Sequence, residues 1–161
     1  CGGPGAAYLY ARKDLIAKYR PKSCGWFSHR EPFAFDMGPI DYADGVMRFS
    51  GGSPGVPALY SARAGYRIVQ KVGVKAIRKR SQAMTARLIE LALALGLKVN
   101  TPMDPALRAG TVSVDFPGSE DACRELIRRK FIVDYRPKAG IRISPHFYNT
   151  DAELQRVLEL L

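Results

Sequence analysis

A glycine-rich segment, Arg48-Phe49-Ser50-Gly51-Gly52-Ser53-Pro54-Gly55, constrains the fold of this chain more than any other stretch. Its paired glycines can adopt backbone angles that are closed to other residues, so a ligand or another chain can come close to the backbone there. Ser53 is a favourable helix N-cap and Pro54 a favourable first helical residue, and residues 56–69 are helix-compatible and apolar on nearly all sides. The segment therefore predicts a buried helix. Its start is either a plain cap or a seat for an anion such as phosphate.

Length and composition indicate a globular protein. With 161 residues the chain has room for one ordinary domain, or for a small domain with part of another. Hydrophobic residues make up 47% of it and charged residues 25%. No run is long and apolar enough to cross a membrane, and three scattered cysteines suit reduced thiols in the cytoplasm. With two histidines and no Cys-x-x-Cys pair, we expect no metal site.

Much of the formal net charge of +10 lies in residues 75–80 and 128–130. Nucleic-acid binding would favour aromatic residues interleaved with these charges, or a recognisable reading motif, and the sequence has neither. We interpret both clusters as solvated helix faces and expect neither nucleic acid nor a membrane as a partner.

The first part of the chain, residues 1–72, is expected to hold few regular elements. A turn at residues 1–5 leads into the apolar run Ala6–Ala11, which predicts a buried strand and indicates that the sequence continues a longer one. Residues 12–19 predict a short helix that ends before a proline.

Residues 21–47 are aperiodic and rich in aromatic side chains. A loop of this length inside a compact domain is either functional or disordered, and the aromatic residues favour order. Trp26 is either a packing anchor under the loop or an indole donor that lines a site. His29 is a structural or exposed histidine, or a general acid or base.

Residues 73–161 predict an independent α+β domain with helices on a sheet. Gly73 marks a hinge before it. The expected elements are a helix over 75–95, strands over 97–99 and 110–116, a helix over 119–130, strands over 131–135 and 140–144, and a final helix with the capping box Thr150-x-x-Glu153.

Arg142 is the most suggestive side chain of that domain. Period-two alternation places Ile141 and Ile143 on one face of the strand and Arg142 on the other. A guanidinium group fits a carboxylate with two parallel hydrogen bonds, so Arg142 is a candidate for holding one. A surface arginine on a half-exposed sheet is an equally good interpretation of the spacing.

Four sets of residues give the chain a family resemblance. They are Gly2-Gly3-Pro4-Gly5, Gly25-Trp26-Phe27-Ser28-His29 with Pro32-Phe33, Arg48-Phe49 with Gly52-Ser53-Pro54, and Gly140-Ile141-Arg142-Ile143-Ser144. In this order and spacing the chain resembles the C-terminal part of fold-type-I pyridoxal-phosphate enzymes of the class V aminotransferase superfamily, and most of all kynureninase. The resemblance covers essentially the whole chain. It implies an α/β fold, with residues 1–72 as the tail of the large domain and residues 73–161 as the small C-terminal α+β domain.

The resemblance also implies roles for single residues. Trp26, Gly52 and Ser53 would bind the cofactor phosphate, Arg142 would hold the substrate α-carboxylate, and His29 would line the substrate site. The lysine that forms the Schiff base with pyridoxal 5'-phosphate would precede Cys1, so no catalytic residue is expected in this chain. A cytoplasmic homodimer with a shared active site and a small amino-acid substrate are further implications.

Three functions remain open on the sequence alone. The first is kynureninase-like hydrolysis of L-kynurenine, or a related amino acid, to anthranilate and L-alanine, a step of tryptophan catabolism. The second is another class V activity, namely an aminotransferase, an epimerase or a cysteine desulfurase-like lyase. Cys123 falls on a predicted helix and not on a mobile loop, which disfavours the desulfurase. The third is a non-enzymatic basic α+β module that binds an acidic partner.

Overall fold

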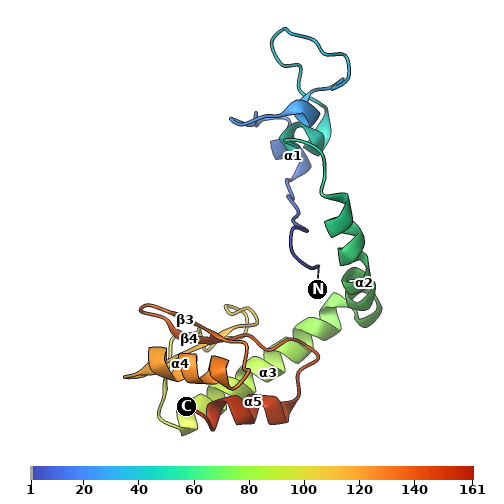
Figure 1. Cartoon of the computed structure of the whole chain (residues 1–161). Coiled ribbons are helices and arrows are strands. Elements are labelled where there is room, and N and C mark those ends of the chain that lie inside the picture. The colour runs from blue at the N-terminus through green and yellow to red at the C-terminus, as the bar shows by residue number, and fades with distance from the viewer. Residues whose placement is uncertain (1) are drawn as a thin grey trace. The chain divides into compact units, whose positions relative to one another are not determined.

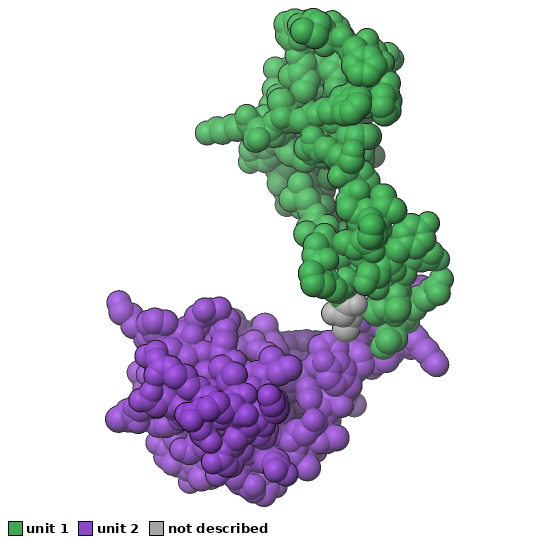
Figure 2. All heavy atoms as spheres, viewed as in Figure 1, with its two compact units in different colours: residues 1–68 green, residues 69–161 purple. Residues whose placement is uncertain are grey.

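The computed structural model describes residues 2–161, so Cys1 lies outside the described residues. The chain forms two compact units, one up to Ile68 and the other Val69–Leu161 (Figure 2). The division falls within the helix α2 (Val56–Val72), shortly before the boundary predicted between residues 72 and 73.

Short helical turns joined by irregular segments make up most of the first unit (Figure 1). They are α1 (Lys13–Ile16) and the 3-10 turns η1 (Trp26–Ser28) and η2 (Gly45–Phe49). The predicted buried strand over Ala6–Ala11 is wrong, because this segment is irregular and its large side chains are exposed. A strand needs a neighbour to pair its backbone groups, and the part of the chain that the structure describes offers Ala6–Ala11 none.

The helix α2 begins at Val56, later than the sequence predicts. The Gly55 carbonyl accepts a helical hydrogen bond at 3.2 Å, so the prediction of Ser53 as N-cap and Pro54 as first helical residue is wrong. Pro57 supplies the reason. In a helix that started at Pro54, the amide of residue 57 would have to donate to the Ser53 carbonyl, and proline has no N–H.

The predicted burial of α2 is also wrong for the described chain. Of its residues, Ala62 and Gly65 are buried. Its larger apolar side chains are exposed, namely Val56, Leu59, Tyr60, Tyr66, Ile68 and Val72. A helix that is apolar on nearly all sides predicts burial in a larger assembly, and residues 2–161 do not cover this one.

The second unit is an antiparallel sheet with three helices (Figure 1). Gly73, at φ 85°, separates α2 from α3 (Val74–Ala94), at the predicted hinge. The following elements are β1 (Lys98–Val99), β2 (Val112–Asp115), α4 (Ser119–Arg128), β3 (Asp134–Arg136), β4 (Gly140–Ile143) and α5 (Asp151–Leu158). The strand order is β1-β2-β4-β3. The predicted succession of helices and strands is confirmed, although β3 begins only at Asp134.

Alternation along the two central strands builds the core of this unit. Val112 and Val114 of β2 and Ile141 and Ile143 of β4 are buried. They join a cluster with residues of α3, α4 and α5, namely Met84, Leu88, Ile89, Ala92, Cys123, Leu126, Leu154, Val157 and Leu158. The helices therefore cover one face of the sheet, and the same alternation turns Arg142 to the opposite face.

Gly140 fixes the register of the hairpin that carries Arg142. Its φ is 85°, and a Cβ at this position would lie 2.1 Å from the Val114 carbonyl oxygen, so only glycine fits. Gly140 pairs with Arg136 across the β3–β4 hairpin, and two steps further along the strands Asp134 pairs with Arg142. Side chains of directly paired residues stand on the same face of a sheet, so the register brings these two together.

Candidate functional site

Two of the sequence motifs in the first unit are held together by Ser28. Its hydroxyl accepts a hydrogen bond from the Gly25 amide at 3.1 Å and donates to the Ser50 carbonyl at 2.6 Å. The backbone of Gly25 also lies against Gly51, where an added Cβ would meet the Gly51 carbonyl oxygen at 1.7 Å. The turn that carries Trp26 is thus fixed beside the glycine-rich segment.

Trp26 lies in an aromatic cluster of the long loop. Its ring centroid is 5.1 Å from that of Phe33 and 5.9 Å from those of Phe27 and Phe35. The indole Nε1–H donates to the Pro32 carbonyl, and the residue is 49% exposed. The aromatic contacts give the loop the order that its composition predicts. The hydrogen bond to Pro32 also shows that the indole donor is used within the chain.

His29 and Trp26 line one cavity, with a volume of about 340 Å³, within the loop. His29 Nδ1 accepts a hydrogen bond from the Glu31 amide at 3.0 Å, so a neutral ring carries its proton on Nε2. A backbone bridge joins His29 to Tyr42 and closes the loop at its base. The sequence-predicted residues Trp26 and His29 are therefore neighbours in the structure.

Arg30 ties the two sides of the loop together next to this bridge. Its Nε donates to Asp41 at 2.8 Å and its Nη1 to Asp44 at 2.7 Å. The hydrogen bond from Arg30 lowers the pKa of the Asp41 carboxyl. This clamp positions the cavity and contributes no side chain to its lining.

Gly52 and Ser53 offer free donors on an exposed backbone. Within residues 2–161, no hydrogen bond is recorded for the amides of Gly51, Gly52 and Ser53 or for the Ser53 hydroxyl. A Cβ built on Gly51 or Gly52 would meet nothing within 4 Å. Amide and hydroxyl donors that are exposed and unused within residues 2–161 suit a phosphate, so the segment fits the phosphate group of a cofactor.

Arg142 makes a two-pronged ion pair with Asp134 in the second unit. Its Nε donates to Oδ1 at 2.7 Å and its Nη2 donates to Oδ2 at 2.5 Å. The hydrogen bond from Arg142 lowers the pKa of the Asp134 carboxyl, and the charge of Arg136 acts in the same direction. Both side chains are about two-fifths exposed, at 41% and 39%. The sequence predicts the face on which Arg142 stands, and the structure adds the carboxylate that orients it.

The polar face around Arg142 continues to both sides. Ser113 of β2 is paired with Arg142, and Asp134 Oδ2 also contacts Arg136 Nη2 at 2.9 Å. Two residues further on, just past the end of β4, the Ser144 hydroxyl lies 2.8 Å from that of Thr111. Two arginines against one aspartate leave this face with a net positive charge, which suits an anionic group of a small ligand.

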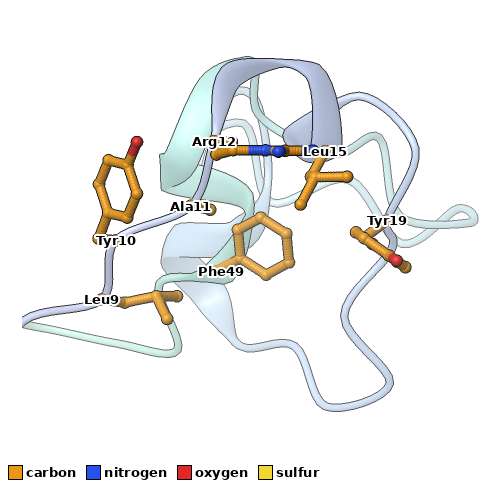
Figure 3. A pocket seen from close by; sticks show the side chains of 7 residues that line it. All are labelled: Leu9, Tyr10, Ala11, Arg12, Leu15, Tyr19 and Phe49. Atoms are coloured by element: carbon orange, nitrogen blue, oxygen red, sulfur yellow. The ribbon is translucent and has the colours of Figure 1, made fainter. Parts of the chain in front are cut away.

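Two further cavities are not lined by the predicted site residues. An apolar one of about 420 Å³ in the first unit lies between Leu9, Leu15, Tyr19 and Phe49 (Figure 3). Another, of about 670 Å³, lies in the second unit between the end of β4 and α5 and includes His146. Across the described part of the chain, no three His, Cys, Asp or Glu residues stand together as a metal site. No described helix has the length and apolar character to cross a membrane.

A sequence model described as the kynureninase C-terminal domain matches residues 77–161, more than half of the chain. The chain belongs to the kynureninase C-terminal domain family. The match covers all of the sheet and with it Arg142 and Asp134. The expected C-terminal part of a class V, fold-type-I enzyme is thereby confirmed.

Curated relatives extend the similarity to the whole chain. An uncharacterized aminotransferase, YcbU of Bacillus subtilis (strain 168), is 31% identical over 159 residues, which is 98% of this chain and 41% of that protein. The kynureninase of Pseudomonas fluorescens is 27% identical over 166 residues, which is 99% of this chain and 40% of that enzyme. The chain thus spans about two-fifths of the length of the curated relatives it matches.

Solved structures share the fold of this chain. An apo cysteine desulfurase from Thermococcus onnurineus NA1 superposes with a TM-score of 0.77 at 20% identity, over 94% of this chain and 40% of that one. A cystine C-S lyase in complex with cysteine persulfide gives 0.75 at 18% identity, over 93% and 40%. Another structure of this lyase holds glycine covalently linked to its pyridoxal-phosphate cofactor. At these identities the likeness establishes the α/β fold.

The two cysteines described by the structure lie in different environments. Cys123 is 2% exposed in the core, and burial raises the pKa of its thiol, so it is a poor nucleophile. Cys24 is exposed and unpaired. The buried position of Cys123 agrees with its prediction on a helix.

Proposed function

We propose that the chain is the C-terminal part of a pyridoxal-phosphate enzyme that hydrolyses the Cβ–Cγ bond of L-kynurenine, or a related amino acid, to give anthranilate and L-alanine. The observation that carries this proposal is the match of the kynureninase C-terminal model to the whole sheet that bears Arg142. The kynureninases among the curated relatives support it.

In this proposal the second unit recognises the amino-acid end of the substrate. Arg142 holds the α-carboxylate through charge-assisted hydrogen bonds. The net positive charge of Arg142 and Arg136 against Asp134 favours an anionic group at this face. Ser113 and Ser144 add neutral polar groups beside it. The pyridoxal phosphate supplies the electron sink for bond cleavage when bound.

The first unit holds the cofactor phosphate. Gly52 and Ser53 fit this role because their amides and the Ser53 hydroxyl are available and exposed. Trp26 can contribute its indole N–H only if it exchanges the Pro32 carbonyl for the phosphate. His29, with its Nε2 proton, would line the substrate side of the same loop.

The proposal includes a cytoplasmic homodimer with a shared active site. Its support is the exposed apolar surface of the loop, where Phe33, Phe35 and Met37 are 65%, 70% and 97% exposed. Exposed large apolar side chains close together in the sequence are typical of an interface. A dimer with a Kd below about 1 μM stays associated at micromolar concentration. Sedimentation of the full-length protein as a monomer at that concentration would therefore contradict this part of the proposal.

A second candidate is transamination. The similarity to YcbU favours it, because that relative has the higher identity of the two described above. The two reactions give different products from the same amino acid. Hydrolysis releases anthranilate and L-alanine, whereas transamination converts the amino acid to its keto acid and needs an acceptor keto acid.

The test uses the full-length protein loaded with pyridoxal phosphate and L-kynurenine. Release of anthranilate without an added keto acid supports hydrolysis, and turnover only with a keto acid supports transamination. Replacing Arg142 by alanine should lower kcat/KM about 100-fold, as expected when a group that orients the substrate is lost. Arg142→Lys keeps the charge but loses the pair of parallel N–H donors, so it should also weaken substrate use.

Arg124→Lys is the matched control, because Arg124 makes two ion pairs on the exposed face of α4. It should leave kcat/KM within about twofold. If Arg142→Ala also stays within a few-fold of the parent, Arg142 does not hold the carboxylate.

A further inference from the structure

We propose that Asp134 is a positioning residue for substrate recognition, which holds the Nε–Nη2 edge of the Arg142 guanidinium and leaves the adjacent Nη1–Nη2 edge to the substrate carboxylate. This inference rests on the proposed function of Arg142. It assigns a role to a residue of β3 that does not itself touch the substrate.

The argument begins with the donors of the guanidinium. The group has five N–H bonds, one on Nε and two on each Nη nitrogen. Asp134 takes the edge formed by Nε and Nη2, with distances of 2.7 and 2.5 Å. The edge formed by Nη1 and the second N–H of Nη2 remains, and within residues 2–161 no hydrogen bond of Nη1 is recorded. That edge can hold a second carboxylate in the same two-pronged way.

The backbone fixes Asp134 in its place. Asp134 lies opposite Arg142 in the β3–β4 ladder, and Gly140 sets this register because no other residue fits the turn. Arg136 Nη2 contacts the same Oδ2 atom at 2.9 Å. The aspartate therefore pairs with two arginines, and the orientation of Arg142 follows from the hairpin.

The charge balance allows a second anion at this face. Two arginines and one aspartate carry a net charge of +1, and the side chains of Asp134 and Arg142 are open to solvent. The Asp134 carboxyl is ionised at neutral pH, and the hydrogen bond from Arg142 lowers its pKa further, so it remains an acceptor when the substrate arrives. A substrate carboxylate then completes a balanced set of two cations and two anions.

The expected consequence is a loss of affinity when Asp134 is removed. Without it, the substrate itself must immobilise the long Arg142 side chain, which should weaken binding of a carboxylate about threefold to tenfold. The loss should appear in KM more than in kcat, because the same contact is made in the ground state and in the transition state.

The experiment compares two ligands of the full-length, cofactor-loaded protein by calorimetry. L-Alanine has the α-carboxylate, and L-alaninamide has the same shape without that charge. Asp134→Ala should weaken L-alanine binding about threefold to tenfold and leave L-alaninamide within about twofold. Adding Asp134→Ala to Arg142→Lys should cause no further loss of L-alanine affinity, because Asp134 acts through the paired N–H donors that lysine lacks.

Asp134→Asn serves if the alanine variant does not fold, since it keeps the size and one acceptor oxygen and should show the same selective loss in smaller measure. Asp121→Asn is the matched control, because Asp121 pairs with Arg124 on the exposed face of α4. It should change neither affinity.

Each other outcome overturns the inference in a recognisable way. Tighter binding of L-alanine by the Asp134 variants would mean that Asp134 competes with the substrate for Arg142. An equal loss for L-alanine and L-alaninamide would mean a merely structural role. An unchanged affinity, while Arg142→Lys is impaired, would remove Asp134 from recognition and leave the proposed function intact. An unaffected Arg142→Lys would instead refute the role of Arg142 itself.

Discussion

Replacement of Ser28 by alanine tests the link between the two motifs of the first unit. The Ser28 side chain is buried, with the residue 1% exposed, and it bonds both Gly25 and the Ser50 carbonyl. The alanine variant leaves a donor and an acceptor without their partner in a region with little room for water. Such a loss costs about 1–3 kcal/mol. We therefore expect Ser28→Ala to loosen the turn at residues 25–28 without unfolding the protein.

The assay is hydrogen exchange of the full-length protein, followed by mass spectrometry of peptides that cover residues 22–30. A cost of about 1–3 kcal/mol raises the exchange rate of the Gly25 amide about fivefold to 150-fold, since 1.4 kcal/mol is a factor of ten. If the proposed phosphate site is correct, the affinity for pyridoxal phosphate should fall as well, because Ser28 holds the turn of Trp26 beside Gly51.

Ser23→Ala is the control, because Ser23 is an exposed neighbour on the same loop. It should leave the exchange of residues 22–30 unchanged. Equal exchange in Ser28→Ala and Ser23→Ala would refute the reasoning, because the hydroxyl of Ser28 would then contribute nothing to the local order.

Three further outcomes are expected. Gly140→Ala should lower the free energy of unfolding by at least about 1 kcal/mol in chemical denaturation, because its φ is positive and its Cβ would meet the Val114 carbonyl; an unchanged midpoint would contradict the register argument. The Glu153 carboxyl has a pKa below its usual 4.5 because Thr150 donates to it, so its stabilising contribution is complete above pH 4.5 and lost as pH falls through the lower folded value. In a plot of melting temperature against pH, the Glu153→Gln variant should therefore lose less stability at acid pH than the parent protein. Parallel curves for the variant and the parent would contradict this expectation. In the folded protein a thiol reagent should label Cys24 well before Cys123, which is buried with a raised pKa, and mass spectrometry of the labelled peptides would expose the opposite order.

In the second unit, local sequence signals were sufficient to predict the helices and where they begin or end. Gly96 ends α3 at a φ of 71°, where the Leu97 amide bonds the Ala92 carbonyl at 3.0 Å. The capping box of Thr150 and Glu153 is present with both hydrogen bonds. These features depend on residues within a few positions of one another, so the sequence displays them directly.

The first unit was harder to predict because its elements depend on distant partners. Ala6–Ala11 has the composition of a strand, but strand formation needs a neighbouring strand. The start of α2 was a different error, since Pro57 was present in the sequence and excludes a helix that begins at Pro54.

The candidate site shows the same contrast. Alternation predicts the side of the sheet on which Arg142 stands, because it concerns a single strand. Its pairing with Asp134 is a property of two strands. Counting outward from the predicted turn at residues 136–140 would have placed residue 134 opposite residue 142, so the signal was available. The bond from Ser28 to Ser50 spans a stretch with no periodicity, and the sequence gives no comparable indication of it.

The number of residues in the β3–β4 turn determines which side chains stand on each face of the sheet. Its turn joins Arg136 to Gly140, and each residue of β4 faces the side that this length dictates. An insertion or deletion that shifts the strand register by one residue here would exchange the two sides, so that Arg142 would enter the apolar core and Ile141 and Ile143 would face the polar side. Insertions and deletions should thus be absent from this turn in working relatives, whereas the irregular stretch between β1 and β2 can vary in length without turning any strand over.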